Sequence, residues 1–278
     1  MFRRQTDISS HFPFGDNWKS YSSTIDSSSI NNATDSLHEL IGGSLSGRTF
    51  LDLGSGSGIH SLAALRLDAS FVYALDLDPV SVETSNHTLS SYSNVEFSRW
   101  EVHEGSVLDI NSLPVEKFDI VYSWGVLHHT GDLYQAISNA ASCVKPGGLL
   151  VLSLYRKTFF DPFWLFEKYI YNHSPVFIQL LFRKIYTFFF VLALSLSGRD
   201  FRTFISSYNS ARGMNYHYDL HDWLGGWPYQ SISSHELDSY LGKLNFCSSP
   251  NHYKSTPTLI QKIGLFGSGC DEYVYLSN

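Results

Sequence analysis

Three glycines at alternate positions constrain this chain more than any other feature. Gly54, Gly56 and Gly58 follow a short apolar run that ends in Asp52, and a helical pattern of apolar residues begins at Ile59. This order predicts a strand, a glycine loop and a helix. Glycines let the backbone approach a ligand with no Cβ in the way, and the helix N-terminus offers free N–H groups. The pattern therefore predicts a ligand site at the end of the first strand.

An acidic residue after the next apolar run indicates what this ligand is. The run of residues 71–75 ends in Asp76, close to the spacing of about 20 residues at which a carboxylate meets a ribose in nucleotide-binding βαβ units. The loop reads G-S-G-S-G and lacks the lysine and hydroxyl of a phosphate-binding P-loop. A ribose-binding acid beside a loop without phosphate provision favours an adenosine ligand that has no phosphate.

Five motifs in order resemble those of the class I S-adenosylmethionine (SAM)-dependent methyltransferases. They are Leu51–Gly58, Ala74–Pro79, Glu104–Asp109, Phe118–Thr130 and Val144–Gly148. The resemblance covers about residues 49–155. It implies SAM as the cofactor, S-adenosylhomocysteine (SAH) as its product, and methyl transfer as the reaction.

The resemblance also implies which residues hold the cofactor. The glycine loop would contact the methionine part of SAM, and Asp76 would accept from two ribose hydroxyls. A helix N-cap is the alternative role for Asp76, although Asp78 is the better cap candidate. Ser106 and Val107 would read the adenine edge, with Asp109 as a weaker candidate. The expected cofactor residues are Trp18, Asp52, Gly54, Ser55, Gly56, Gly58, Asp76, Leu77, Ser106, Val107, Ser123, Trp124 and Gly125.

Two regions supply candidate groups for the methyl acceptor. His128 and His129 follow the fourth expected strand, where one could act as a general base, although packing beneath the cofactor is the alternative. The segment Arg212–Tyr229 gathers His, Asp, Trp and Tyr around a Gly-Gly pair. The catalytic candidates are His128, His129, His217 and Asp222. The substrate-binding candidates are Tyr21, Arg212, Asp219, His221, Trp223 and Tyr229.

The same segment resembles a signature of a narrower group of bacterial methyltransferases, for which surface saccharides or secondary metabolites are suggested acceptors. Relatives carry an acid where this chain has Gln230, which puts the role of that acid in doubt. Asp219, His221 and Asp222, with His217, could also form a metal site. We instead expect this segment to form a hydrogen-bonded wall of the acceptor pocket, and we predict no metal.

The pattern of strands and helices predicts an α/β fold. Strand and helix alternate over residues 49–155, which implies a Rossmann-like, seven-stranded, mostly parallel sheet with helices on both faces. Residues 1–48 would form an N-terminal cap, as a loop and then a helix near 31–41. Residues 156–230 would form an inserted helical substrate cover that ends in the loop Arg212–Tyr229. Residues 231–278 would add the closing helix and strands.

Composition limits the partners. The chain of 278 residues carries a net charge of −7, which argues against a nucleic-acid backbone as partner. Three widely spaced cysteines and the lack of a signal-peptide pattern at the start favour the cytoplasm. The very apolar residues 176–196 include Arg183 and Lys184, so a buried or cover helix is expected, with membrane contact as the alternative.

These observations lead to one functional prediction with named rivals. We expect a SAM-dependent methyltransferase that acts on a small-molecule or saccharide acceptor, by O-methylation first and N-methylation second. A lipid or quinone methyltransferase and a non-catalytic SAM-binding scaffold are the alternatives. The sequence indicates neither the acceptor atom nor the oligomeric state.

Overall fold

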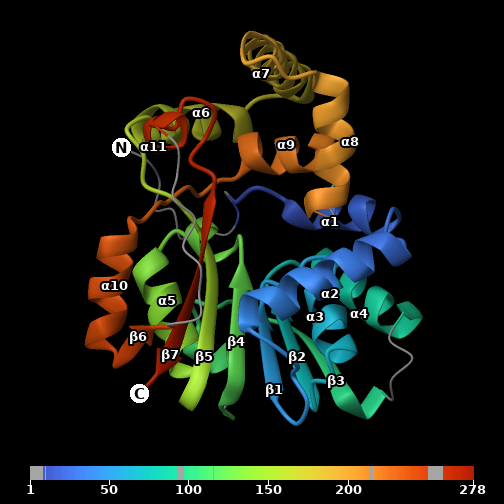
Figure 1. The fold of residues 1–278 in the computed structure, drawn as a ribbon, viewed down its shortest axis with the longest axis vertical. Coiled ribbons are helices and arrows are strands. Elements are labelled where there is room, and N and C mark those ends of the chain that lie inside the picture. The colour runs from blue at the N-terminus through green and yellow to red at the C-terminus, as the bar shows by residue number, and fades with distance from the viewer. Residues whose placement is uncertain (1–8, 10, 93–96, 115, 213–215, 250–258) are drawn as a thin grey trace.

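A seven-stranded sheet forms the centre of the protein, in the order β3-β2-β1-β4-β5-β7-β6 (Figure 1). The computed structural model describes residues 9, 11–92, 97–114, 116–212, 216–249 and 259–278. The strands are β1 (Thr49–Leu53), β2 (Phe71–Asp76), β3 (Trp100–Glu104), β4 (Phe118–Trp124), β5 (Val144–Tyr155), β6 (Phe246–Ser248) and β7 (Cys270–Ser277). The first five pair in parallel, and β7 runs antiparallel to β5 and β6. The predicted Rossmann-like, mostly parallel sheet is confirmed.

Helices cover both faces of this sheet, as predicted. One face packs against α2 (Ser27–Ile41), α3 (Ile59–Arg66) and α4 (Pro79–Tyr92), and the other against α5 (Leu133–Ser142) and α10 (Ser234–Lys243). Successive side chains of a strand point to opposite faces. In β1, Leu51 and Leu53 accordingly pack on the α5 side, whereas Phe50 packs on the α3 side. Burial on both faces explains why these strands read as apolar runs.

The chain between β5 and α10 lies beyond the carboxyl ends of the parallel strands (Figure 1). It forms α6 (Asp161–Asn172), α7 (Val176–Leu196), α8 (Phe201–Arg212) and α9 (Tyr216–Gly225). These helices share an aromatic core that includes Tyr155, Trp164 and Tyr171. Ligands of open α/β sheets bind at this edge. The remaining short elements are η2 (Phe97–Arg99), η3 (Ile110–Ser112), η4 (Leu127–His129) and α11 (Leu259–Ile263).

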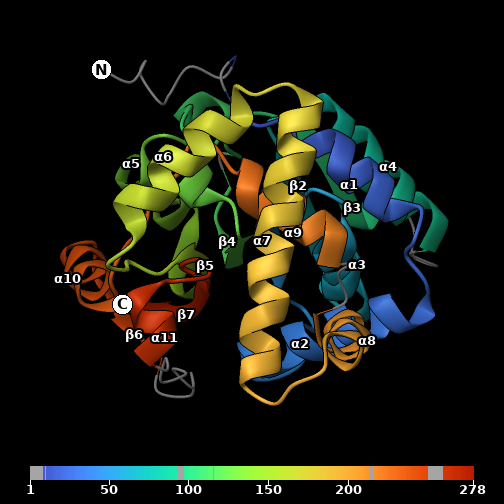
Figure 2. The same cartoon turned by 90° about the horizontal axis from the view of Figure 1, so that it is seen from above.

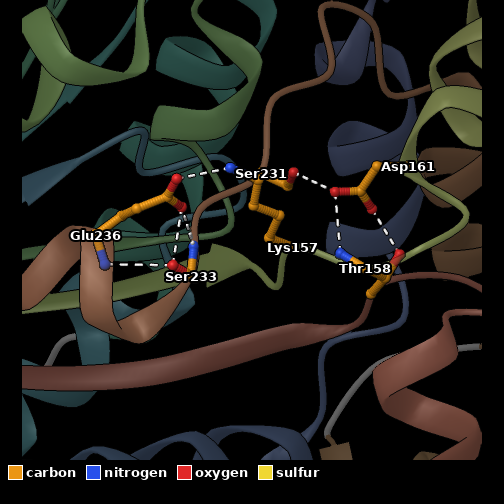
Figure 3. Close-up of polar contacts among 6 residues, drawn as sticks. All are labelled: Lys157, Thr158, Asp161, Ser231, Ser233 and Glu236. Carbon is orange, nitrogen blue, oxygen red and sulfur yellow. Dashed lines mark hydrogen bonds and ion pairs between the residues drawn. The ribbon is translucent and has the colours of Figure 1, made fainter.

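Polar contacts fasten this helical segment to the sheet (Figure 3). Asp161, at the start of α6, accepts from the backbone N–H of Thr158 at 3.0 Å and from the hydroxyls of Thr158 and Ser231. Glu236, in the capping box of α10, accepts from the Lys157 ammonium at 2.6 Å. The chain that leaves β5 is thus held against the chain that enters α10.

Two local predictions were wrong. The segment Arg212–Tyr229 was expected to be a loop, but residues 216–225 form α9, whose Leu220 and Leu224 pack into the aromatic core. The N-terminal region was expected to be a loop up to about residue 31, but it contains α1 (Phe14–Ser22) and α2 begins at Ser27. Helix α1 has no side-chain cap, and its Gly15 N–H instead donates to Asp78 Oδ2 at 3.0 Å. Tertiary contact therefore defines α1, which local sequence signals do not reveal.

Candidate active site

The glycine loop between β1 and α3 approaches its neighbours more closely than a side chain would permit. Gly54 and Gly56 both have positive φ, at 83° and 54°. A Cβ on Gly54 would lie 2.4 Å from the Val126 side chain, and one on Gly56 would lie 3.1 Å from the Trp18 ring. Both glycines line a cavity, so the loop presents bare backbone to it.

Gly58 and Ser55, the other two loop residues among the expected cofactor residues, contact helix α4. Gly58 is the N-cap of α3, packs against Ser85 of α4 and is absent from the cavity lining. Ser55 lines the cavity, and its hydroxyl lies 2.9 Å from that of Ser85. The loop is thus held from below by α4 while its upper surface faces the cavity.

Asp76 ends β2 with its carboxylate at the glycine loop. Oδ2 accepts from the Gly56 N–H at 2.8 Å and Oδ1 from the Asp78 N–H at 3.0 Å. The helix cap is Asp78, since its Oδ1 accepts from the Val80 N–H at 2.8 Å. Burial raises the pKa of Asp76 to about 6, against the opposing effect of these N–H donors. Asp76 and the adjacent Leu77 line the cavity.

Asp52 lies beneath the loop. It is buried, accepts from the Ser61 hydroxyl at 2.6 Å and does not line the cavity. Burial raises its pKa to about 7, with a further contribution from the charge of Asp76. Its role in this geometry is to support the loop from the α3 side.

Ser106 and Val107 follow β3 and line the cavity next to Asp76. The Ser106 oxygen accepts from the Leu108 N–H at 3.2 Å, which leaves the hydroxyl proton for a ligand. The Val107 carbonyl accepts from the Asn139 side chain at 2.8 Å. This contact fixes the Ser106–Val107 turn against α5.

The residues at the end of β4 differ in how they meet the cavity. The Ser123 hydroxyl is buried and donates to the Leu53 carbonyl at 2.9 Å, away from the cavity. Trp124 and Gly125 line the cavity, and the Trp124 Nε1 donates to Glu272 at 2.9 Å. Gly125 has a φ of 77° and turns the chain toward η4.

Helix α1 forms a wall over the glycine loop. Trp18 and Tyr21 both line the cavity, with ring centroids 5.9 Å apart in an edge-to-face arrangement. Asp78 holds the start of this helix through Gly15. The structure thus places Tyr21, a predicted substrate residue, beside the predicted cofactor residue Trp18.

His128 and His129 lie in η4, and both line the cavity. The His129 Nδ1 lies 2.7 Å from the Pro228 carbonyl oxygen, which can only accept, so Nδ1 carries the proton and Nε2 keeps a lone pair. The His128 Nδ1 accepts from the Tyr155 N–H at 3.3 Å, so its proton is on Nε2, which has no hydrogen-bond partner among the described residues. The His129 ring also has a hydrogen bond with the Gly226 backbone, and the His128 Nε2–H is a buried donor without a partner among the described residues.

Burial favours the neutral form of both histidines. Burial lowers the pKa of His129 to about 3, with the neighbouring Lys168 charge acting in the same direction. Burial also lowers the pKa of His128 well below its usual value, and a positive charge on His129 or Lys168 would lower it further. A neutral imidazole suits hydrogen bonding to a polar ligand better than strong base catalysis.

Helix α9 lines the same cavity through Asp219, Asp222 and Trp223. Asp222 is buried, and its Oδ1 has no hydrogen-bond partner among the described residues. Burial raises its pKa well above its usual value, and a hydrogen bond with Asn17 opposes the rise. Asp219 accepts from the Tyr208 hydroxyl, and burial raises its pKa to about 6.

The remaining predicted acceptor residues lie elsewhere. The His221 Nδ1 is 2.8 Å from the Tyr171 hydroxyl, and Tyr229 donates to Asp161; neither residue lines the cavity. The side chains of Arg212 and His217 lie outside the described residues. Among the residues that the structure describes, no three His, Cys, Asp or Glu side chains are grouped as metal ligands.

Gln230, which the sequence resemblance singled out, has a structural contact. The side-chain Oε1 of Gln230 accepts from the Leu133 N–H at 2.9 Å, and the backbone N–H of Gln230 donates to the His128 carbonyl at 3.0 Å. The side chain therefore satisfies a free donor at the start of α5. A carboxylate at this position would make the same contact.

A buried charged pair was missed in the sequence analysis. Glu167 and Lys168 are buried in α6, and Lys168 lies over the Trp223 ring at 3.5 Å and donates to the Trp223 carbonyl. Burial lowers the pKa of Lys168 to about 7 and raises that of Glu167 to about 7. A sequence signal existed, because both residues fall between Trp164 and Tyr171 at the helical spacing of a buried stripe.

One cavity joins all these walls. Its volume is about 2130 Å³, and it runs from the glycine loop, Asp76 and Ser106 to His129 and Asp222. Pockets for one small ligand hold roughly 300–1,000 Å³. The cavity therefore has room for a cofactor and a second molecule at once.

Comparison with known proteins is consistent with this geometry. Residues 51–152 match the family model described as a methyltransferase domain. A ribosomal protein L11 methyltransferase of Azotobacter vinelandii is 35% identical over 117 residues, which are 42% of this chain and 37% of that protein. A ubiquinone biosynthesis O-methyltransferase of Xanthomonas campestris pv. campestris is 36% identical over 115 residues, 41% of this chain and 46% of that protein. The chain thus spans less than half the length of these relatives.

Solved structures share the fold. The structure of PKMT2 from Rickettsia typhi in complex with AdoHcy aligns with 93% of this chain and 55% of the PKMT2 chain. The TM-score is 0.54 and the sequence identity is 16%. The magnesium protoporphyrin IX methyltransferase from Synechocystis PCC 6803, with bound SAH, covers 90% and 84% with a TM-score of 0.50 and 16% identity. At such identity the likeness concerns the fold alone. Together with the matched motifs and the bare glycine loop beside Asp76, the family match identifies residues 51–152 as a class I SAM-dependent methyltransferase domain.

Proposed function

We propose that this protein transfers the methyl group of SAM to a hydroxyl of a small molecule or saccharide, with N-methylation as the second choice. The observation that carries the proposal is a cavity whose lining includes both the glycine loop and Asp222, His128 and His129. The loop side fits an adenosine ligand, and the part lined by Asp222 and the histidines offers hydrogen-bonding groups within an aromatic wall. Acceptors with several hydroxyls suit such a wall.

The chain supports methyl transfer mainly by positioning. The acceptor oxygen attacks the methyl carbon, the bond from carbon to sulfur breaks, and SAH leaves as a neutral thioether. Holding both reactants in line supplies much of the acceleration. The acceptor proton passes to Asp222, since burial has raised the pKa of this carboxyl and its Oδ1 lacks a partner among the described residues.

His128 would orient the acceptor. The unpartnered Nε2–H of His128 would donate to an acceptor hydroxyl, and His129, which Pro228 and Gly226 hold in place, would pack beside it. Gly226 lets α9 approach η4, because a Cβ there would lie 2.5 Å from His129 Cε1 and 2.9 Å from the Asp222 carbonyl oxygen. The proton acceptor and the orienting group thus share one end of the cavity.

A second candidate is methyl transfer to a lipid or quinone. The observation that favours it is the course of the cavity, which is also lined by Tyr186 and Phe190 on the inner face of the apolar helix α7. A long apolar acceptor would suit this aromatic extension. Turnover that requires detergent or vesicles would favour this candidate over a soluble saccharide.

Replacement of Asp222 by Asn tests the acceptor side. We expect methyl transfer from radiolabelled SAM to a responsive acceptor to fall by about 100-fold or more, since general-base groups contribute 10²–10⁴-fold. SAH affinity should stay unchanged, because Asp222 is not among the expected cofactor residues. Glu104→Gln, which alters an exposed carboxylate that does not line the cavity, is the matched control and should retain turnover. Unchanged turnover in Asp222→Asn would refute the assignment.

A further inference from the structure

The outer face of α7 is mainly apolar and carries the exposed Lys184. Its exposed residues recur at helical spacing, and the exposed fractions reach 69% at Phe177, 64% at Phe188 and 82% at Leu196. The exposed apolar residues of this face are Val176, Phe177, Leu180, Leu181, Ile185, Phe188, Phe189, Leu192 and Leu196. A helix on the surface of a water-soluble domain normally carries charged or polar residues on this side. An apolar surface of this extent marks an interaction site.

The inner face of the same helix is already used. Phe182, Tyr186 and Phe190 pack into the aromatic core with α6, α8 and α9. The Tyr186 hydroxyl also donates to the Phe266 carbonyl at 2.8 Å. Core packing thus accounts for one side of α7 and leaves the other side unexplained.

We infer that this outer face of α7 rests on the surface of an anionic lipid bilayer. Charge favours this occupant over another protein. Between residues 176 and 212 the chain has five Lys or Arg and one Asp, although its net charge is −7. Lys184, Arg199 and Arg202 are exposed. An apolar face flanked by basic residues is the pattern of helices that bind anionic membrane surfaces.

The packing of α7 indicates that it lies along the bilayer plane. By length and apolar composition alone, its 21 residues suffice to cross a membrane. Its inner face, however, is fixed to the protein, and Figure 2 shows α7 running across the top of the molecule above α9. Exposed Phe163 and Phe166 on the adjacent α6 extend the apolar surface beside it. A helix attached in this way can insert its outer side chains without spanning.

Membrane contact at α7 would adjoin the acceptor end of the cavity. Tyr186 and Phe190 line the cavity from the inner face of α7, and Tyr208 of α8 lines it next to Asp219. A molecule held at the bilayer surface would thus be close to the cavity wall. The membrane inference itself does not depend on which acceptor is used.

Vesicle sedimentation of the full chain tests the inference. We expect the protein to pellet with vesicles of phosphatidylcholine and phosphatidylglycerol, to bind phosphatidylcholine alone more weakly, and to be partly released by salt. Phe177→Ser with Phe188→Ser should lower the partition coefficient by about tenfold or more for each ring. Lys184→Gln should reduce only the preference for the anionic lipid.

Controls separate this result from misfolding and from self-association. Tyr92→Ser alters an exposed aromatic residue on α4 and should leave sedimentation unchanged. SAH affinity should be the same in all variants, because none of these residues belongs to the cofactor site. Absence of vesicle binding by the unaltered protein would overturn the inference. A dimer in light scattering that the Phe177/Phe188 change dissociates, without vesicle binding, would assign the face to a second copy instead.

Discussion

Asp76 offers the sharpest test of the cofactor site. Each carboxylate oxygen has two acceptor positions, and one on each oxygen is occupied by a backbone N–H, from Gly56 at 2.8 Å and from Asp78 at 3.0 Å. The acceptor positions that remain can take ribose hydroxyls. Asp76→Asn keeps one such acceptor, and Asp76→Ala keeps none. A hydrogen bond to a charged group contributes about 1.5–3 kcal/mol, so we expect about tenfold weaker SAH binding for Asn and about 100-fold or more for Ala.

Isothermal titration with SAH measures this effect, and circular dichroism checks the fold of each variant. Glu104→Gln is the matched control, because Glu104 pairs with Asp76 across β3 and β2 but is exposed and absent from the cavity lining. Its affinity should equal that of the unaltered protein. Unchanged affinity in a folded Asp76→Ala would refute the ribose assignment.

Three further predictions follow from the same geometry. Gly56→Val should abolish SAH binding in a folded protein, because the side chain would meet Trp18 at positive φ; Gly147→Val, also at positive φ but with open space around it, should bind normally, and titration would show the contrast. The pKa of Asp76 near 6 predicts that SAH affinity falls as pH drops below about 6, by up to about tenfold per unit, and that Asp76→Asn removes this dependence; a flat profile for the unaltered protein would contradict the role of the carboxylate. Burial raises the pKa of Asp222 in the folded state, so ionisation of this carboxyl destabilises the fold at any pH above the pKa that Asp222 has in the unfolded chain. Asp222→Asn should therefore raise the melting temperature at pH 8 and leave it nearly unchanged near pH 4. A lower melting temperature at pH 8 would indicate a structural role.

The core of the fold was predictable because its signals are local. The Gly54–Gly58 loop, Asp76 and the alternation of apolar runs each report a feature within a few residues, and their order along the chain defines the sheet. It was also predictable that Asp78, and not Asp76, caps α4, since Asp78 stands directly before Pro79. The predicted alternation over residues 49–155 therefore matches the observed β1 to β5.

The walls of the cavity were less predictable because long-range contacts form them. Helix α1 has no cap and is held by Asp78 at a sequence distance of 63 residues. The aromatic, acidic and histidine residues of α9 are typical of a loop in sequence. The segment is helical in the structure, where Leu220 and Leu224 pack into the aromatic core. The catalytic and acceptor roles assigned to α9 and η4 remain predictions.

The most direct test of the account is a crystal structure with SAH. The account predicts the ribose at Asp76, the adenine against Ser106 and Val107, and the sulfur directed toward the end of the cavity that holds His129 and Asp222. Bound SAH whose sulfur points away from that end, with Asp222 outside the reach of any acceptor, would contradict the central claim that cofactor and acceptor share this cavity.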